Sequence, residues 1–346
     1  MANRGSCVLI PDSRLIIFPY VRSARNIIRG AKVLKNFDIS KYFTNFAGEF
    51  VIFKIMNHIS KAQIKLIRSL QQKKFRDETG LFVAEGTKCV EELCKGFELE
   101  LLIRSQETEV SIQFSGFSSQ KSGVGNQDRY LSASPKEIEQ MSGLKTPQGV
   151  IGVFKKPITN HPSHITNNGL VLALDGIQDP GNLGTIIRTC DWFGVHDIFC
   201  SQDTADCYNP KVVQATMGAL ARVRVHYVDL PAWLQSPITN HHSPINIYGT
   251  LLDGKNMYEV LRAEGRSKSE AVLQRSGLTG EAGLAVIIMG NEGNGISQEV
   301  RRFITHPLFI PAYTDEGKYK ETSDVVESLN VSIATAIVLA EFRRTN

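Results

Sequence analysis

The sequence lacks the patterns that mark several common protein classes. Its six cysteines include no C-x-x-C pair and follow no regular spacing. A disulfide framework is therefore not expected in a chain of 346 residues, and a reduced, cytoplasmic setting is predicted. No apolar run approaches the ~18 residues that a membrane span needs, so we expect no membrane association. The eight histidines lie without cysteines or carboxylates at ligand spacing, and no metal site is predicted.

Three enzyme motifs are also missing. The sequence has no G-x-x-x-x-G-K-[ST] string and no G-x-S-x-G elbow, which argues against a P-loop and against a serine hydrolase. The stretch GNEGNG has glycines at 290, 293 and 295, in the order G-x-x-G-x-G. This order is the reverse of the dinucleotide fingerprint, which normally opens its domain, so a nicotinamide site is not expected.

Charge is unevenly distributed along the chain. The net charge is +4, but residues 1–55 hold nine Lys/Arg and three acids, which is +6 and leaves −2 for residues 56–346. Net charge therefore gives no argument for nucleic-acid binding, and local patches must carry it. The apolar core of RLIIFPYVR is too short for a signal peptide. An organelle transit peptide stays open, but we favour an extension of uncertain status upstream of a natural start at Met56.

Residues 56–155 are predicted to form a small α/β domain. Residues 60–76 read as one amphipathic helix capped by Ser60, followed by alternating strand and helix patterns. A second helix should begin at Pro135 with Ser134 as its cap, after a long loop at 105–129. The expected RNA contacts are the basic residues of the first helix, although a solvated charged face is the alternative. These residues are Lys61, Lys65, Arg68, Lys73, Lys74 and Arg76.

Residues 156–169 are predicted to be a linker, and residues 170–346 a second α/β domain. Near-continuous apolar strand candidates alternate there with helix candidates, which indicates a parallel sheet covered on both faces. The strand candidates are LVLALD, DIFC, RVRVHYV, INIYGT, LAVIIM and HPLFIP. Helices are expected near residues 182, 210, 256, 297 and 328.

Three loop segments follow strand candidates of this second domain. They are DPGNLGTIIRTCDWFG at 179–194, MGNEGNGIS at 289–297, and a long segment at 309–337 that ends in SLNVSIATAI. Ligands of open α/β sheets bind at the carboxyl ends of the strands, so these segments are the candidate site.

Together the three segments resemble the SpoU (TrmH-like) RNA ribose 2′-O-methyltransferases over about residues 170–346. The preceding KLIRSLQQKKFRDETGLFVAEGTKCVEELCKG resembles the small ribosomal-protein-like RNA-binding domain of many members, which implies that residues 56–155 bind the RNA substrate. The resemblance implies S-adenosylmethionine as cofactor, a C-terminal trefoil knot and a homodimer formed through the C-terminal domain. Ribosomal RNA is the expected substrate, with a 23S-type guanosine as first guess. Methylation of tRNA and a non-catalytic RNA-binding module of the same fold remain alternatives.

The resemblance also assigns catalytic residues. Arg188 matches the arginine that activates the ribose hydroxyl, either as a base or by lowering the pKa of the hydroxyl electrostatically. Asn182 is expected to cap the helix of Arg188. Glu292 matches the acid of the second segment, and Ser328 and Asn330 match polar residues of the third. Simple helix capping by Ser328 is the alternative for that residue.

Four further residues are expected to hold the cofactor. Gly290, Ile310 and Leu329 match positions that meet it, and Thr250 is expected to border the same pocket. Core packing is the alternative for Ile310 and Leu329. Residues 312–326 form an insertion of roughly ten residues beyond the usual family loop. Two alternatives remain for these residues, an ordered lid and a flexible insertion.

Overall fold

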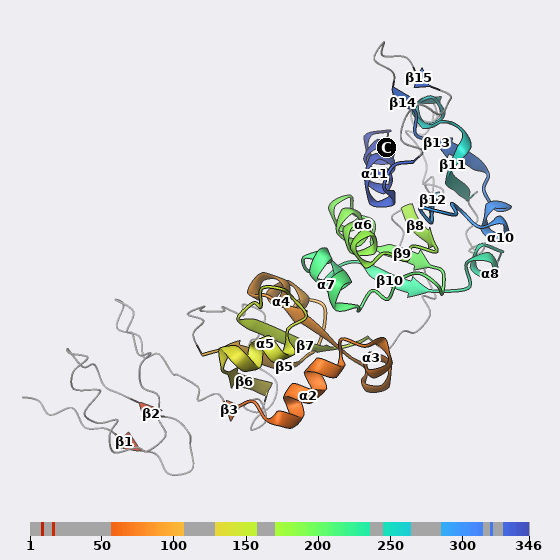
Figure 1. Ribbon diagram of the computed structural model, residues 1–346. Coiled ribbons are helices and arrows are strands. Elements are labelled where there is room, and N and C mark those ends of the chain that lie inside the picture. The colour runs from red at the N-terminus through yellow and green to blue at the C-terminus, as the bar shows by residue number, and fades with distance from the viewer. Residues whose placement is uncertain are drawn as a thin grey trace, which may run out of the picture.

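The computed structural model describes residues 57–106, 129–157, 170–235, 245–263, 285–313 and 328–345, with short strands at Val8–Leu9, Ile16–Ile17 and Tyr319–Lys320. Most of the loop candidate at 105–129 and most of the linker candidate at 156–169 lie outside these residues, and Ser105 ends a strand. The described residues form two α/β units, each built on its own sheet (Figure 1).

The first unit has a five-stranded mixed sheet in the order β3-β6-β5-β7-β4. Its strands are β3 (Asn57–His58), β4 (Leu81–Glu85), β5 (Leu99–Ser105), β6 (Tyr130–Ala133) and β7 (Val150–Lys155). Its helices are α2 (Lys61–Ser69), α3 (Lys73–Thr79), α4 (Thr87–Leu93) and α5 (Pro135–Met141). Ser60 and Ser134 cap α2 and α5, as predicted, and the structure adds that each cap is a capping box, with Gln63 and Glu137.

The prediction of one helix over residues 60–76 is wrong. The chain leaves α2 at Leu70, and Gln72 has extended backbone angles before α3 begins. The Arg76 guanidinium explains the break, because its Nη1 donates to the carbonyl oxygens of Leu70 and Gln71 at 2.9 Å each. These bonds satisfy carbonyls that a continued helix would otherwise have used.

The second unit has the predicted parallel sheet. Its six strands run in the order β10-β9-β8-β12-β11-β13, and every neighbouring pair is parallel. The strands are β8 (Leu170–Asp175), β9 (Asp197–Cys200), β10 (Arg224–Tyr227), β11 (Asn246–Asn256), β12 (Ala285–Gly290) and β13 (His306–Phe309). All six were predicted as strands from their apolar runs.

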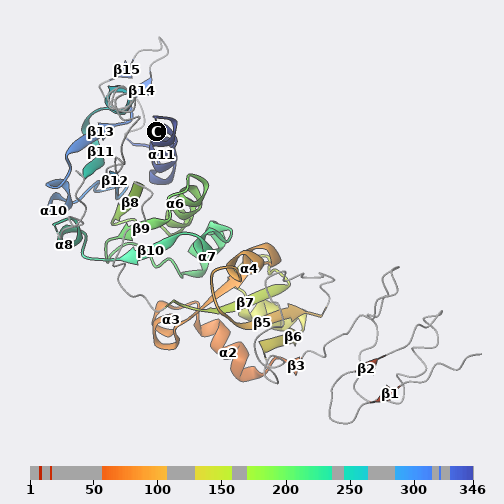
Figure 2. The ribbon, with the colours of Figure 1, turned by 180° about the vertical axis from the view of Figure 1, so that it is seen from behind.

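Helices cover both faces of this sheet, and strand alternation divides β8 between two cores. Leu170, Leu172 and Leu174 pack into the core under α6 (Pro180–Trp192), α7 (Pro210–Thr216) and α11 (Val331–Thr345). Val171 and Ala173 pack against α8 (Leu230–Gln235) and α10 (Gln298–Arg301) on the other face. Figure 2 shows the two helix layers on opposite sides of the strands.

Several elements had no clear sequence pattern. They include β3, β6, α8 and the short helix η2 (Ala219–Ala221). In the insertion, β14 (Ala312–Tyr313) pairs antiparallel with β15 (Tyr319–Lys320), and the other residues of 314–327 lie outside the described part. Among the described residues, no helix has the length and apolar character to cross a membrane.

Candidate active site

The helix α6 starts one turn earlier than its predicted cap. Asp179 is the N-cap, and its Oδ1 accepts a hydrogen bond from the amide of Asn182 at 2.8 Å. Pro180 occupies the first helical position, where its fixed φ fits and its missing N–H costs nothing. The prediction that Asn182 caps α6 is therefore wrong, and its side chain is available for another contact.

A closed loop follows β12. Asn291 and Gly295 bridge each other through two backbone hydrogen bonds of 2.9 and 2.8 Å. The Asn291 side chain accepts from the amides of Gly293 and Asn294 and donates to the carbonyl of Gly176, at the end of β8. A Cβ on Gly290 would lie 2.4 Å from backbone atoms of Gly295 and Ile296, so only glycine fits there.

Side chains from all three predicted segments meet in one hydrogen-bonded cluster. The Asn330 Nδ2 donates to Asn182 Oδ1 at 2.9 Å and to Glu292 Oε1 at 2.7 Å. The same Glu292 oxygen accepts from the amide of Val331 at 3.1 Å. The positions in sequence are separated by 38 and 148 residues, yet one amide group joins them. The structure thus brings together Asn182, Glu292 and Asn330.

Asn330 also starts the last helix. Its Oδ1 accepts from the amides of Ser332 at 3.0 Å and Ile333 at 3.3 Å, which is the contact pattern of an N-cap. The cap is therefore Asn330, and the alternative of capping by Ser328 is wrong. Ser328 is exposed and makes no hydrogen bond with the part of the chain that the structure describes.

The helices α6 and α11 run side by side and are joined at both ends. Asn182 and Asn330 connect their N-terminal ends. At the other end, Arg343 donates through Nε to the carbonyl of Phe193 at 2.6 Å and through Nη2 to that of Gly194 at 3.0 Å. These carbonyls end α6 and would otherwise be open to solvent. The helix that carries Arg188 is thereby fixed in position.

Arg188 lies on the exposed face of α6. Its guanidinium makes no hydrogen bond or ion pair with any of the described residues. The structure therefore does not join Arg188 to the cluster of Asn182, Glu292 and Asn330. A guanidinium without a partner among the described residues is chemically suited to bind an anion such as a phosphate.

Three of the four predicted cofactor residues belong to neighbouring strands of the sheet or directly follow one. Gly290 ends β12, Ile310 directly follows β13, and Thr250 lies within β11, one residue after its last pairing with β12. Thr250 is half-buried and its Oγ1 lies 3.5 Å from the carbonyl of Ile288. Ile310 packs partly against the main core, whereas Leu329 is 48% exposed. These four positions offer backbone and apolar groups and no cation, which fits a ligand with a positively charged sulfonium.

The six predicted RNA contacts separate into three groups. Lys61, Lys65 and Arg68 are exposed on one face of α2. Lys73 and Lys74 are exposed on α3 but pair with Asp77 at 2.7 Å and Glu78 at 3.9 Å. Arg76 is 1% exposed and pairs with Asp206, so its prediction as an RNA contact is wrong.

Three positioning residues escaped the sequence interpretation. Asp179 could have been found, because Asp before Pro is an N-cap followed by a first-turn proline. The contacts of Asn291 and Arg343 depend on residues more than 100 positions away, Gly176 and Phe193, and no local pattern reveals them.

Two family models match this chain. The SpoU rRNA Methylase family matches residues 169–340, and the MRM3-like substrate binding domain matches residues 61–152. A solved protein from Porphyromonas gingivalis, assigned to the TrmH family of RNA methyltransferases, is 34% identical. Its TM-score is 0.63, and the match covers 83% of this chain and 99% of that one. The chain belongs to the SpoU rRNA methylase family.

Two further relatives carry more specific names. The 23S rRNA (guanosine(2553)-2′-O)-methyltransferase RlmP of Bacillus subtilis is 27% identical, over 81% of this chain and 96% of the relative. The AdoMet-bound rRNA methyltransferase of Sinorhizobium meliloti is 28% identical with a TM-score of 0.62, over 84% of this chain and 97% of that chain. The resemblance to SpoU methyltransferases that was inferred from the three segments is therefore confirmed.

Proposed function

We propose that this SpoU family chain is an S-adenosylmethionine-dependent RNA ribose 2′-O-methyltransferase that acts on ribosomal RNA. The observation that carries the proposal is the contact of Asn182, Glu292 and Asn330, which unites three distant segments at the carboxyl edge of the sheet. The names of the B. subtilis and S. meliloti relatives favour ribosomal RNA over tRNA, and a guanosine as first target.

The cofactor would be held by the edge formed by Thr250, Gly290, Ile310 and Leu329. When bound, S-adenosylmethionine supplies an electrophilic methyl group. Gly290 lets the backbone of Gly295 and Ile296 pack against the end of β12, which sets the shape of the loop that would border the cofactor. The apolar groups of Ile310 and Leu329 would shield the site from water.

The remaining task of the protein is to activate a poor nucleophile. A ribose 2′-hydroxyl must lose its proton as it attacks, and a positioned side chain assists that loss. We assign this role to Arg188, whose guanidinium has no partner among the described residues. It acts either as a base oriented by a substrate phosphate, or as a fixed positive charge that stabilises the developing oxyanion. Asn182, Glu292 and Asn330 would orient the ribose and the two helices around it, and Ser328 would contribute a further hydroxyl.

RNA would be bound by the exposed face of α2. Lys61, Lys65 and Arg68 carry no ion pair among the described residues, so their charges are available to backbone phosphates. Lys73 and Lys74 would contribute less, because acids of α3 already neutralise them.

Two family properties are also part of the proposal. The C-terminal segment is expected to form the trefoil knot, and the protein to work as a homodimer through this domain. Trp192 on α6 is 84% exposed and Ile333 on α11 is 54% exposed, and such apolar side chains favour a protein interface.

A cytoplasmic location is also part of the proposal, and the buried free thiols of Cys190, Cys200 and Cys207 suit a reducing compartment. The domain boundaries 56–155 and 170–346 remain predictions from the sequence.

The test is methyl transfer from labelled S-adenosylmethionine to separate pools of ribosomal RNA and tRNA from cells lacking the gene. Label in the large ribosomal RNA, at a position resistant to alkaline cleavage, is the expected result. Label in tRNA alone would correct the substrate. Cofactor binding by calorimetry without any transfer would instead indicate the non-catalytic module.

A further inference from the structure

The two α/β units share one hydrophobic core. Phe82 of β4 lies 4.9 Å from the ring of Tyr208, just before α7, and its ring also meets Phe97 and Phe154 of its own unit. The buried Cys89 of α4 donates to the carbonyl of Val213 on α7 at 3.9 Å. Both units therefore contribute buried side chains to a continuous cluster.

Backbones also approach closely across this interface. A Cβ built on Gly96 would lie 2.5 Å from the carbonyl oxygen of Ala221. A Cβ on Gly218 would lie 2.3 Å from the Cβ of Glu92, and Gly218 has a φ of +90°. Each unit thus contributes one glycine at a point where the other unit lies too close for a side chain. Such close packing is typical of a permanent interface rather than a transient one.

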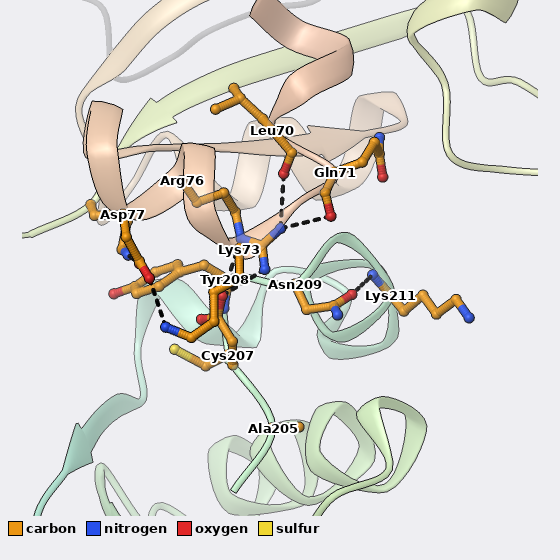
Figure 3. Close-up of polar contacts among 12 residues, drawn as sticks. Leu70, Gln71, Lys73, Arg76, Asp77, Ala205, Cys207, Tyr208, Asn209 and Lys211 are labelled. Atoms are coloured by element: carbon orange, nitrogen blue, oxygen red, sulfur yellow. Dashed lines mark hydrogen bonds and ion pairs between the residues drawn. The ribbon is translucent and has the colours of Figure 1, made fainter. Parts of the chain in front are cut away.

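A buried arginine crosses the interface at one end. Arg76 of α3 donates through Nη2 to Asp206 Oδ2 at 2.7 Å and through Nε to the same oxygen at 3.1 Å. Its Nη1 is held by the carbonyls at the end of α2 (Figure 3). The side chains of Arg76 and Asp206 are 2% and 10% exposed. Separating the units would leave both charges without partners, which is costly in a buried setting.

A second arginine crosses the interface after η2. Arg222 donates through Nη1 to Glu92 of α4 at 2.7 Å and through Nε and Nη2 to Asp191 of α6 at 2.8–3.1 Å. Hydrogen bonds from Lys95 and Arg222 hold the pKa of Glu92 below its usual value. Asp191 lies three residues after Arg188 on the same helix. Arg222 therefore connects the first unit directly to the helix of the proposed catalytic arginine.

We propose that Arg76 and Arg222 are positioning residues that hold the RNA-binding unit at a fixed offset from Arg188. RNA bound to the face of Lys61, Lys65 and Arg68 is then presented to the catalytic edge in one register. The offset, together with the contacts at the edge, selects which ribose is methylated. This inference rests on the proposed function for its substrate, but the rigid docking itself does not.

The test of docking is a distance measurement that needs no activity. Spin labels at Lys136→Cys on α5 and Arg302→Cys after α10 occupy exposed positions of the two units. The free chain should give one narrow distance distribution. Arg76→Lys, which keeps the charge but loses the forked contact, and Arg222→Ala should each broaden it. Lys155→Ala is the matched control, since Lys155 pairs with Glu98 and Glu100 inside its own unit.

The test of positioning uses the same variants without labels. S-adenosylmethionine affinity and kcat at saturating RNA should stay near wild type, while the KM for RNA rises at least about tenfold and methylation spreads to neighbouring riboses. A broad distribution in the wild-type chain would overturn the docking. If the variants show broadened distance distributions but keep the wild-type KM for RNA and methylate the same ribose, the positioning role is overturned. A wild-type chain that methylates no RNA would overturn the proposed function and that role together, while the distances alone would still decide the docking.

Discussion

At the scale of single residues, the site depends on amides that serve two contacts at once. Asn330 caps α11 through its oxygen and joins Asn182 to Glu292 through its nitrogen. Asn291 closes its own loop through its oxygen and reaches Gly176 through its nitrogen. Asn182, Glu292 and Asn330 were predicted as site residues from the three segments, whereas Asn291 was not. Their pairing was not, because contacts over 38 to 148 residues depend on the fold.

Substitutions at Asn330 should separate these two roles. Asn330→Ala loses both, so we expect about 1 kcal/mol of lost stability and roughly a 100-fold loss of methyl transfer. Asn330→Ser keeps a good cap but cannot reach Asn182 and Glu292, so its stability should stay near wild type while transfer falls similarly. Thermal melts and single-turnover assays measure the two effects. Equal activity of Asn330→Ser and wild type would contradict the role of the cluster.

The thiols of Cys89 and Cys207, which are buried, and of Cys94, which is partly buried, give a second prediction at this scale. Burial raises the pKa of Cys89 and Cys94 to about 11 and that of Cys207 to about 12. Since only the thiolate reacts, these thiols should resist iodoacetamide at pH 8 in the folded protein and react after unfolding. A Cys7→Ser background removes the thiol outside the described residues. Because the folded values are raised, ionisation of these thiols favours unfolding as pH climbs above about 9. Rapid labelling at pH 8 in the native state would disprove the burial.

At the scale of elements, the strongest sequence patterns were the most reliable. The six apolar strands of the second sheet form as predicted, and Ser60 and Ser134 cap α2 and α5 as predicted. The break between α2 and α3 was missed, because helical periodicity continues through Leu70 while a distant ion pair of Arg76 and Asp206 decides the geometry. Tertiary contacts override local pattern where a charged side chain is buried.

That break predicts which basic residues of the first unit bind RNA. Replacing Lys61, Lys65 and Arg68 by glutamine should weaken binding and reduce the slope of log affinity against log salt by about 2. Lys73→Gln with Lys74→Gln should change that slope by less than about 1, because both are already paired. Filter binding of a large-subunit ribosomal RNA transcript over a salt series measures the slopes. Larger effects from the Lys73 and Lys74 pair would contradict the assignment.

At the scale of the whole molecule, the family could be predicted from three short segments, whereas the joint between the units could not. Phe82, Cys89 and Val213 look like ordinary core residues of separate domains. Only the structure shows that they share a core and that Arg76 and Arg222 cross it. A basic residue on an amphipathic helix was interpreted as an RNA contact because sequence alone cannot reveal burial.

The role of residues 1–55 is testable at the same scale. The first sheet begins with β3 at Asn57, and Ile59 is 4% exposed in its core. A chain that starts at Met56 therefore contains every strand of both large sheets and should melt within about 2 °C of the full chain. Scanning calorimetry of both proteins makes the comparison. Failure of the shorter chain to fold would show that the extension belongs to the fold.

The measurement that bears most directly on the proposed function is single-turnover methyl transfer by Arg188→Ala, with cofactor affinity measured in parallel. Arg302→Ala, at an exposed arginine after α10 on the opposite face of the sheet from α6, is the control. We predict that Arg188→Ala loses at least about 1,000-fold in transfer rate but binds S-adenosylmethionine within about threefold of wild type. Near-normal transfer by Arg188→Ala would contradict the assignment of Arg188 as the residue that activates the ribose hydroxyl.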